Sequence, residues 1–418
     1  MLEFADVPYR FYPSAPNRLV QAAARFVNRH IALPGPVHQI SGLHLRGHSA
    51  ILDQSRESNA RFLFLPNHST HSDPEILLEA TRRVDRPCVF MAAYDVYLRS
   101  PVHAWLLQKS GSFSVDRDAS DRKALNQATE ILKTPGSSLT IFPEGNSWLS
   151  NDRIHPFLAG AALTGLRAAK SDAETADPLW FVPTSVKTTF ERDESAVLRD
   201  RALALAKEAG LAVDRGLEPL ELVRQIGIAL LGRHLPKELS RQFESGIGTS
   251  EERAREIAFR LLGDVASEAA VSFRADESEF ISRFSRLRST IHSVLAADEG
   301  VHSDRRQAEE WSRKVLLAAR IYSYTDGYLA ELPTVDRLGE RVLNLIEDHG
   351  SFSPRSLGPR HAIVRFGAPI HAAGFGAEHG FRGDAARLLT ATVEKAVQAG
   401  IDEINQDNPW PGGRRAEW

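Results

Sequence analysis

Residues 62–74 read Phe-Leu-Phe-Leu-Pro-Asn-His-Ser-Thr-His-Ser-Asp-Pro, and this stretch indicates both the fold and the chemistry of the chain. Its four apolar residues are too few for a typical helix and end at Pro66, which is typical of a buried strand. Ser72 or Asp73, with Pro74 at the first helical position, predicts the start of a helix. The polar residues between them therefore lie where a strand leads into a helix, a place that often carries chemistry.

His68 and Asp73 are the candidate catalytic pair in this stretch. A histidine can take a proton from a hydroxyl near neutral pH, and a carboxylate on its other ring nitrogen fixes the tautomer and stabilises the imidazolium. Two other interpretations stay open on the local sequence. One is a polar turn with a helix cap. The other is a metal site with His68, His71 and Asp73 as ligands, although this spacing matches no zinc signature.

The composition limits the possible classes of protein. The chain has 418 residues, which suits one large domain with an insertion or two to three domains. Its formal net charge of −3 gives no reason to expect a nucleic-acid partner. Cys88 is the only cysteine, so a reducing compartment is expected. Without an apolar run of ~18 residues or a signal peptide, we expect a cytoplasmic protein, and any contact with the inner face of a membrane would be peripheral.

Short apolar runs alternate with amphipathic segments between residues 40 and 194. The predicted strands are 61–65, 88–92, 112–115, 139–142 and 180–186. The predicted helices are 74–83, 101–109, 121–133 and 160–169. Before them, residues 18–31 have the pattern of an amphipathic helix, packed either on the core or on a membrane surface. The alternation predicts an α/β fold with a mixed, largely parallel sheet flanked by helices.

Strand patterns nearly vanish between residues 195 and 354. Apolar residues recur there every three or four positions, which predicts helices at 198–209, 219–234, 251–271, 276–297, 304–331 and 335–348. A strand at 362–366 and a helix at 383–405 follow. We therefore predict an N-terminal helical segment (1–39), an α/β domain (40–194 and 355–406), an all-helical insertion before the last strand (195–354) and a loose tail (407–418).

Three further clusters lie at or within predicted strands. Asp116-Arg117 ends one strand, and arginine suits bidentate phosphate binding. Phe142-Pro143-Glu144-Gly145 ends another, and its glycine permits close backbone approach. Val182-Pro183 lies within a third. Taken singly, these clusters are typical of a surface salt bridge, a turn and a structural strand.

Together, in this order and spacing, the motifs resemble the glycerolipid acyltransferase family, which includes 1-acylglycerol-3-phosphate and glycerol-3-phosphate acyltransferases. That family carries an Asn-His-x-x-x-x-Asp block, a later Asp-Arg or similar pair, a Phe-Pro-Glu-Gly block and a Val-Pro strand. This chain has Asn67-His68 with Asp73, then Asp116-Arg117, Phe142-Pro143-Glu144-Gly145 and Val182-Pro183. The resemblance covers residues 40–190 and 360–405 and implies an acyltransferase-type sheet.

The resemblance implies transfer of a fatty acyl group from acyl-CoA or acyl carrier protein, as co-substrate, to a hydroxyl of an acceptor. The acceptor would be glycerol-3-phosphate or a lysophospholipid such as lysophosphatidate, in glycerophospholipid biosynthesis at a membrane surface. His68 would be the general base and Asp73 would orient it. The acceptor would be held by Asn67, Arg117, Glu144 and Gly145. No metal or redox cofactor is implied.

The chain departs from the family pattern in two motifs. Asn146-Ser147-Trp148 stands where the family often has Thr-Arg-Ser, so one arginine for the acceptor phosphate is missing. His71 stands where many relatives have serine. Three alternatives therefore stay open: an acyltransferase for a non-phosphate lipid acceptor, a metal-dependent hydrolase using His68, His71 and Asp73, and an inactive relative that binds lipid.

Overall fold

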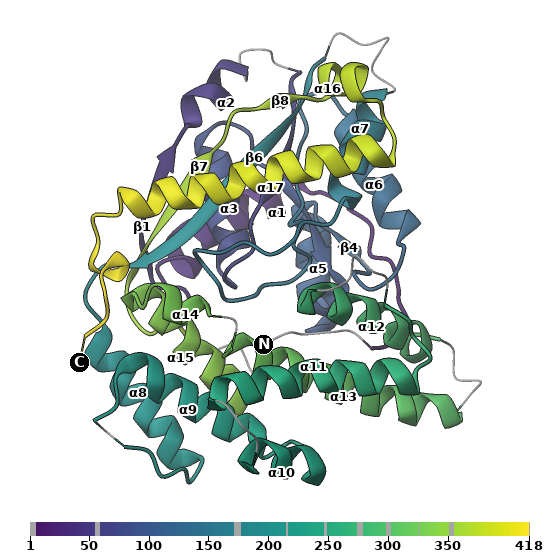
Figure 1. Cartoon of the computed structure of the whole chain (residues 1–418). Helices are drawn as coiled ribbons and strands as arrows, with labels where there is room; N and C mark the ends of the chain where they lie inside the picture. The colour runs from purple at the N-terminus through teal and green to yellow at the C-terminus, as the bar shows by residue number, and fades with distance from the viewer. Residues whose placement is uncertain are drawn as a thin grey trace.

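A mixed sheet of eight strands forms the centre of the structure, a computed structural model that describes residues 6–54, 59–170, 177–214, 216–245, 249–273, 279–297, 302–325, 327–350 and 355–417 (Figure 1). The strands are β1 (Ile40–Arg46), β2 (Arg61–Pro66), β3 (Val89–Ala93), β4 (Phe113–Val115), β5 (Ser138–Thr140), β6 (Leu179–Phe190), β7 (Arg360–Phe366) and β8 (Ile370–His371). Their order is β1-β7-β6-β2-β5-β3-β4, with β8 paired to β6. β7 and β8 run antiparallel to β6, while the other pairings are parallel. The predicted mixed, largely parallel α/β fold is confirmed.

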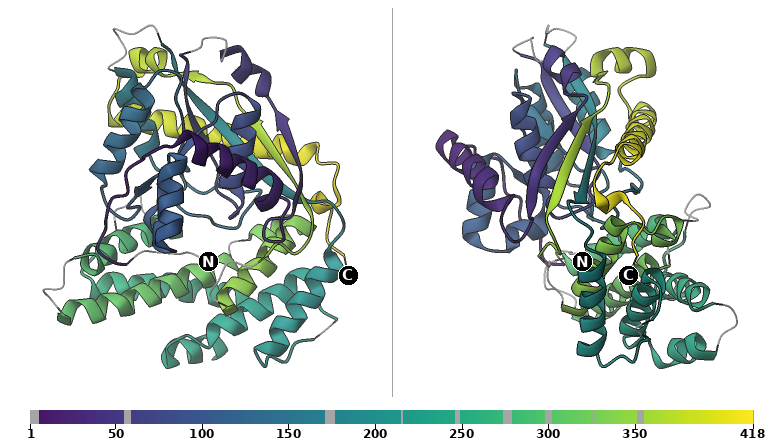
Figure 2. Two further views of the ribbon diagram at one scale, coloured as in Figure 1. Left: turned by 180° about the vertical axis from the view of Figure 1, so that it is seen from behind. Right: turned by 90° about the vertical axis from the view of Figure 1, so that its left-hand side faces the viewer.

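Helices cover both faces of this sheet, as the side view in Figure 2 shows. They are α1 (Arg18–Val27), continued by a π-helix (Asn28–Ala32), α2 (His48–Gln54), α3 (Asp73–Arg83), α4 (Tyr94–Leu98), α5 (Pro101–Ser110), α6 (Arg122–Lys133), α7 (Gly160–Lys170), α16 (Ala372–His379) and α17 (Gly383–Gln406). Alternation along β2 explains the two layers. Phe62 and Phe64 join the buried cluster that includes α3, whereas Leu63 and Leu65 join the cluster of α6, α7 and α17.

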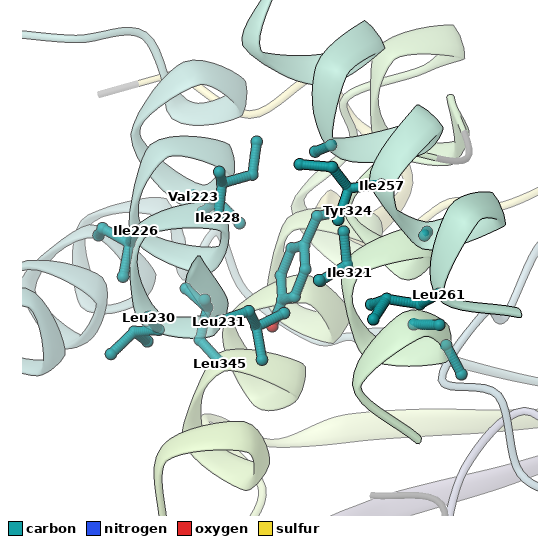
Figure 3. Packing of buried hydrophobic residues seen from close by; sticks show 14 of the residues in the cluster. Val223, Ile226, Ile228, Leu230, Leu231, Ile257, Leu261, Ile321, Tyr324 and Leu345 are labelled. Carbon is teal, nitrogen blue, oxygen red and sulfur yellow. The ribbon is translucent and has the colours of Figure 1, made fainter. Parts of the chain in front are cut away.

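The chain between β6 and β7 forms a helical unit, which is defined here as residues 195–350. Its helices are α8 (Ser195–Glu208), α9 (Pro219–Gly232), α10 (Lys237–Ser245), α11 (Ser250–Glu268), α12 (Phe280–Leu295), α13 (His302–Ser323), α14 (Tyr328–Glu331) and α15 (Val335–Gly350). They pack around one cluster of mainly aliphatic side chains, part of which Figure 3 shows around Tyr324. The unit lies beyond the carboxyl ends of the parallel strands (Figure 1), where ligands bind in open α/β sheets.

The predicted strands all occur, but the edge strand β1 and the short strand β8 were missed. β1 was not predicted because its sequence, Ile-Ser-Gly-Leu-His-Leu-Arg, is largely half-exposed and carries no continuous apolar run. β8 has only two residues. The predicted 139–142 strand begins one residue earlier and ends at Thr140, so Phe142 belongs to the loop that follows. The predicted start of the 276–297 helix lies outside the described residues, as does the predicted domain boundary at 354.

The C-terminal tail is packed rather than loose. It forms a 3-10 turn (Pro411–Gly413), and Trp410 stacks on His361 of β7 with ring centroids 4.5 Å apart. The Ala416 N–H donates to the carbonyl of Pro333 at 2.8 Å, and Arg415 forms a bridge with Thr334. The tail therefore connects the sheet to the start of α15, a long-range contact that the tail's Pro, Gly and Arg content did not indicate.

Candidate active site

His68 and Asp73 meet where β2 leads into α3, as the sequence predicts. The Nδ1 atom of His68 lies 3.0 Å from Oδ2 of Asp73. The same carboxylate accepts the Thr70 N–H at 2.8 Å and the Thr70 hydroxyl at 2.7 Å. Asp73 is fully buried, whereas the His68 side chain is 20% exposed. The carboxylate is thus held by the turn itself and points at one ring nitrogen of the histidine.

The other ring nitrogen of His68 is placed for chemistry. The imidazole stacks on Phe142, with ring centroids 4.2 Å apart and planes inclined by 27°. With Nδ1 bound to Asp73 and one face covered by Phe142, the ring has a fixed orientation. Within the described part of the chain, Nε2 has no hydrogen-bond partner. A neutral imidazole held in this way can accept a proton at Nε2.

Glu144 fixes the backbone beside His68. One carboxylate oxygen accepts the His68 N–H at 2.7 Å, and the other accepts the His155 N–H at 3.1 Å. The side chain is buried, and this burial raises the pKa of Glu144 well above its ordinary value. Both oxygens are used by the protein, so the geometry assigns Glu144 a positioning role. Its predicted contact with the acceptor stays a prediction.

Arg117 and Gly145 lie in contact, and their predicted roles in holding the acceptor stay predictions. The Arg117 guanidinium donates to the Gly145 carbonyl at 3.0 Å and to the Asn146 side chain at 2.6 Å. It also forms an ion pair with Asp95 at 2.9 Å. Gly145 has a φ of +74°, which favours glycine, and a Cβ there would lie 3.2 Å from the side chain of Leu158. Arg117 therefore supports the Glu144–Asn146 turn.

Asn67 lies deeper in the protein than we would expect of a residue that contacts substrate. Its side-chain amide donates to the Val186 carbonyl at 2.9 Å and accepts the Val186 N–H at 2.7 Å. It is buried, with 1% of its surface exposed. Asn67 thereby ties the end of β2 to β6 beside His68. The structure gives it a positioning role, and a direct contact with substrate stays a prediction.

His71 points away from the pair and toward the helical unit. Its Nε2 atom lies 2.8 Å from a carboxylate oxygen of Glu347 on α15. The sequence alone could not indicate this contact, because the two residues are 276 positions apart. In the part of the chain that the structure describes, no three His, Cys, Asp or Glu side chains come together in a way that could hold a metal ion. The alternative with His68, His71 and Asp73 as ligands thus lacks a matching arrangement.

A buried ionic cluster that the sequence analysis missed joins β6 to α15. Lys187 of β6 binds Asp152 and lies 3.5 Å from Asp336, while Arg337 binds the second oxygen of Asp152 at 2.8 Å. These partners lower the pKa of Asp152 to about 2, against the effect of burial. Burial raises the pKa of Glu340, a neighbouring residue on α15, to about 8. A lysine inside an apolar strand was the one available signal, since lysine is rarely buried without a partner.

A cleft of about 380 Å³ lies next to this arrangement. One side consists of Arg117, the Glu144–Asn146 turn and residues 155–158. The other side is α12 of the helical unit. Glu144 and Trp148 connect the cleft to His68, because Glu144 accepts the His68 N–H and the Trp148 N–H lies 3.4 Å from the His68 carbonyl.

Comparison with known protein families finds a match over a range that includes the candidate site. Residues 49–185 match the Acyltransferase family, and this range contains β2 to the middle of β6 with His68, Asp73, Arg117 and Glu144. No curated protein matches the chain. The match supports a transferase with general acyltransferase activity. The helical unit, the N-terminal helix and the tail lie outside the matched range.

Proposed function

We propose that the protein is an O-acyltransferase in which His68 is the general base. The observation that carries this proposal is the His68–Asp73 contact of 3.0 Å, with the His68 side chain 20% exposed. Nε2 takes the proton of an acceptor hydroxyl while its oxygen attacks the carbonyl carbon of an acyl thioester. A carbon–oxygen bond forms and the carbon–sulfur bond breaks. The proton on Nε2 then passes to the leaving thiolate, so the products are an ester and a free thiol.

The family resemblance suggests acyl-CoA or acyl carrier protein as donor. It suggests glycerol-3-phosphate or a lysophospholipid such as lysophosphatidate as acceptor. A second candidate within the same chemistry is a lipid acceptor without phosphate. One observation favours it: Arg117, the arginine expected to bind phosphate, already pairs with Asp95 and with the Glu144–Asn146 turn.

Acyl transfer from radiolabelled palmitoyl-CoA or palmitoyl-acyl carrier protein to glycerol-3-phosphate, lysophosphatidate and monoacylglycerol tests the reaction. We expect His68→Ala to lower the rate by ~10²–10⁴-fold, as loss of a general base does. His71→Ala is the matched control, because this histidine lies in the same turn but contacts Glu347, and it should keep most of the activity. Folded protein that transfers to none of these acceptors, or whose rate is the same in His68→Ala, would contradict the proposal.

We also propose that the protein docks on a membrane through the face formed by α1 and α5, called here the α1–α5 face. No residue of α1 is buried, and large apolar side chains on both helices are half or more exposed: Leu19, Phe26, Ile31 of the following π-helix, Val102 and Trp105. The two helices lie side by side on the outside of the sheet (Figure 2). Basic residues accompany them at Arg18, Arg25 and Arg29, which suits an anionic lipid surface. Among the described residues, no helix is long and apolar enough to span a bilayer.

Sedimentation with phosphatidylglycerol-containing vesicles tests this face. We expect the double substitution Phe26→Ser and Trp105→Ser to reduce the bound fraction, since both side chains offer apolar area to the lipid. Leu388→Ser is the control, because Leu388 is 47% exposed on α17, in the layer on the opposite side of the sheet. Equal binding of the double variant and the control would contradict the assignment.

A further inference from the structure

The cleft beside the candidate active site has two walls of different origin. One wall consists of the predicted site residues Arg117, Glu144 and Gly145 with the segment 155–158. The other wall is α12, which belongs to the helical unit and lies outside the family match. Figure 1 shows α12 directly beyond the β4 edge of the sheet. The helical unit therefore contributes to the space where an acceptor head group would lie.

α12 turns a hydroxyl-bearing face toward this space. Ser282, Ser285 and Ser289 line the cleft together with Ile281, Phe284 and Arg288, and Ser285 and Ser289 are exposed. Their spacing of three and four residues places them on one side of a helix. The opposite side of α12 carries Phe280, Leu287, Ile291 and Leu295, which are buried in the core of the helical unit. The helix is thus held by its apolar side and offers hydroxyl groups to the cleft.

Each positively charged side chain at the cleft has at least one carboxylate partner. Arg117 pairs with Asp95 at 2.9 Å. Arg288 of α12 pairs with Asp6 at 2.8 Å and with Asp118 at 3.3 Å. His292, one turn further along α12, lies 2.9 Å from Asp116.

The remaining titratable groups that line the cleft add no positive charge. Burial lowers the pKa of His155 to about 3, so this ring is neutral near pH 7. Glu144 is the other titratable group in the lining. In the described residues, the surroundings of the cleft therefore offer no net positive charge to a phosphate dianion, whose transfer out of water requires one.

We infer that α12 is the acceptor-specificity element and that it selects an uncharged, hydroxyl-bearing head group through Ser282, Ser285 and Ser289. This inference rests on the proposed acyl-transfer function and narrows its acceptor. Serine hydroxyls can both donate and accept, which suits the hydroxyls of a glycerol-type head. A site of this kind recognises the hydroxyl groups of its ligand through hydrogen bonds rather than through charge.

Steady-state transfer of palmitate from palmitoyl-CoA to 1-palmitoylglycerol and to 1-palmitoylglycerol-3-phosphate tests the inference. These acceptors share the acyl chain and differ in the phosphate. We expect the wild type to have the higher kcat/KM with 1-palmitoylglycerol. The double substitution Ser285→Ala and Ser289→Ala should raise KM for this acceptor by ~5–10-fold, from the loss of two hydrogen bonds, with little change in kcat. Ser293→Ala is the matched control, because Ser293 is exposed on α12 but does not line the cleft.

A second variant tests the inference through a change of charge, which does not rely on the small free energies of single hydrogen bonds. Ser285→Arg adds a cation to the cleft and should raise kcat/KM for the phosphorylated acceptor while lowering it for the uncharged one. A wild type that prefers the phosphorylated acceptor, or a KM that the serine substitutions leave unchanged, would overturn the inference while leaving acyl transfer established. Folded protein that transfers palmitate to neither of these acceptors nor to glycerol-3-phosphate would instead contradict the proposed function itself.

Discussion

The sheet region and the helical unit use their buried polar side chains differently. In the sheet region, Asn67 binds the backbone of Val186 and Glu144 binds the N–H groups of His68 and His155, so both side chains bind within their own region. In the helical unit many of them reach out of the unit instead. From α15, Asp336 accepts the Phe190 N–H, Glu340 accepts the Asn151 N–H, and Glu347 binds His71. From α12, Arg288 and His292 bind Asp6, Asp116 and Asp118.

This difference shows how an added helical unit becomes part of a site. Its core consists mainly of aliphatic side chains of the unit itself, with Phe190 of β6 and Ala416 of the tail joining them. Its position is set by two sets of contacts from charged side chains, which are called here the joints. The joint on α15 consists of Asp336, Glu340 and Glu347, and the joint on α12 consists of Arg288 and His292. Charged contacts are geometrically specific, so they fix where α12 stands relative to the Glu144–Asn146 turn. The sheet region orients the reactive groups, and the helical unit closes the cleft beside them.

We expect the largest effect from Asp73→Asn, which tests whether the sheet region orients the reactive groups. An amide cannot replace the carboxylate that holds Nδ1–H of His68, so the imidazole would lose its tautomer and its charge stabilisation. We expect kcat to fall by ~10³–10⁴-fold, by analogy with loss of the carboxylate in hydrolase triads. The measurement is acyl transfer by protein whose thermal unfolding is recorded in parallel. A variant that is equally stable and equally active would mean that the buried carboxylate only caps α3.

The second largest effect is expected where β6 meets α15. Lys187→Met leaves Asp152 and Asp336 buried with one partner fewer, which should lower the free energy of unfolding by ~3–5 kcal/mol. Arg387→Met on α17 is the matched control. It removes an ion pair with Asp384 whose side chains are 73% and 92% exposed, and it should cost less than ~1 kcal/mol. Urea unfolding measures both. Equal losses of unfolding free energy in the two variants would mean that the buried contacts between β6 and α15 stabilise the protein no more than a surface ion pair does.

Much of the sheet region could be predicted from the sequence because its signals are local. The strand ending at Pro66 and the helix beginning at Asp73 are set by neighbouring residues, and the His68–Asp73 contact spans five positions. The apolar periodicity of the helical unit likewise predicted helices where α8, α9, α11, α12, α13 and α15 lie. The short α10 was missed, since it has few apolar residues.

The joints could not be predicted because their partners are far apart in the chain. His71 and Glu347 are separated by 276 residues, and His292 and Asp116 by 176. Nothing in the sequence around Ser285 distinguishes a serine that faces a cleft from one that faces bulk solvent. The roles of Asn67 and Glu144 show a related limit: the family resemblance suggested substrate contacts, whereas burial and bonding distances place both side chains on backbone groups.

A moderate effect is expected from Glu144→Gln. Glutamine offers one acceptor in place of two, so an amide N–H group would face the N–H of His68 or His155, at a cost of ~1–3 kcal/mol. If Glu144 only positions His68, kcat falls and KM for the acceptor stays nearly constant. Glu394→Gln is the control, since one Glu394 oxygen accepts the Phe157 N–H at 2.7 Å and an amide carbonyl can do the same. A raised acceptor KM in Glu144→Gln alone would instead restore the predicted substrate contact.

The smallest effect concerns the joint on α12 and appears as a pH dependence. His292 faces Asp6 and Asp116, with Asp118 and Arg288 nearby, and these carboxylates raise its pKa from 6.5 to about 9 despite burial. Because the folded pKa lies above the unfolded one, the stabilisation is fully present below pH 6.5 and is lost as the pH rises through 9. His292→Gln should be less stable at pH 6 and should lose less stability than the wild type between pH 8 and 9.5.

Thermal unfolding across this pH range separates His292 from the joint on α15. Glu340, with a pKa raised from 4.5 to about 8, also makes stability fall with rising pH, but its contribution changes between those two values. A slope above pH 8 that disappears in His292→Gln and persists in Glu340→Gln would assign that slope to α12. A slope unchanged in His292→Gln would mean that the carboxylates around α12 do not hold the protonated ring. The position of the cleft wall would then depend on α15 and on Arg288 alone.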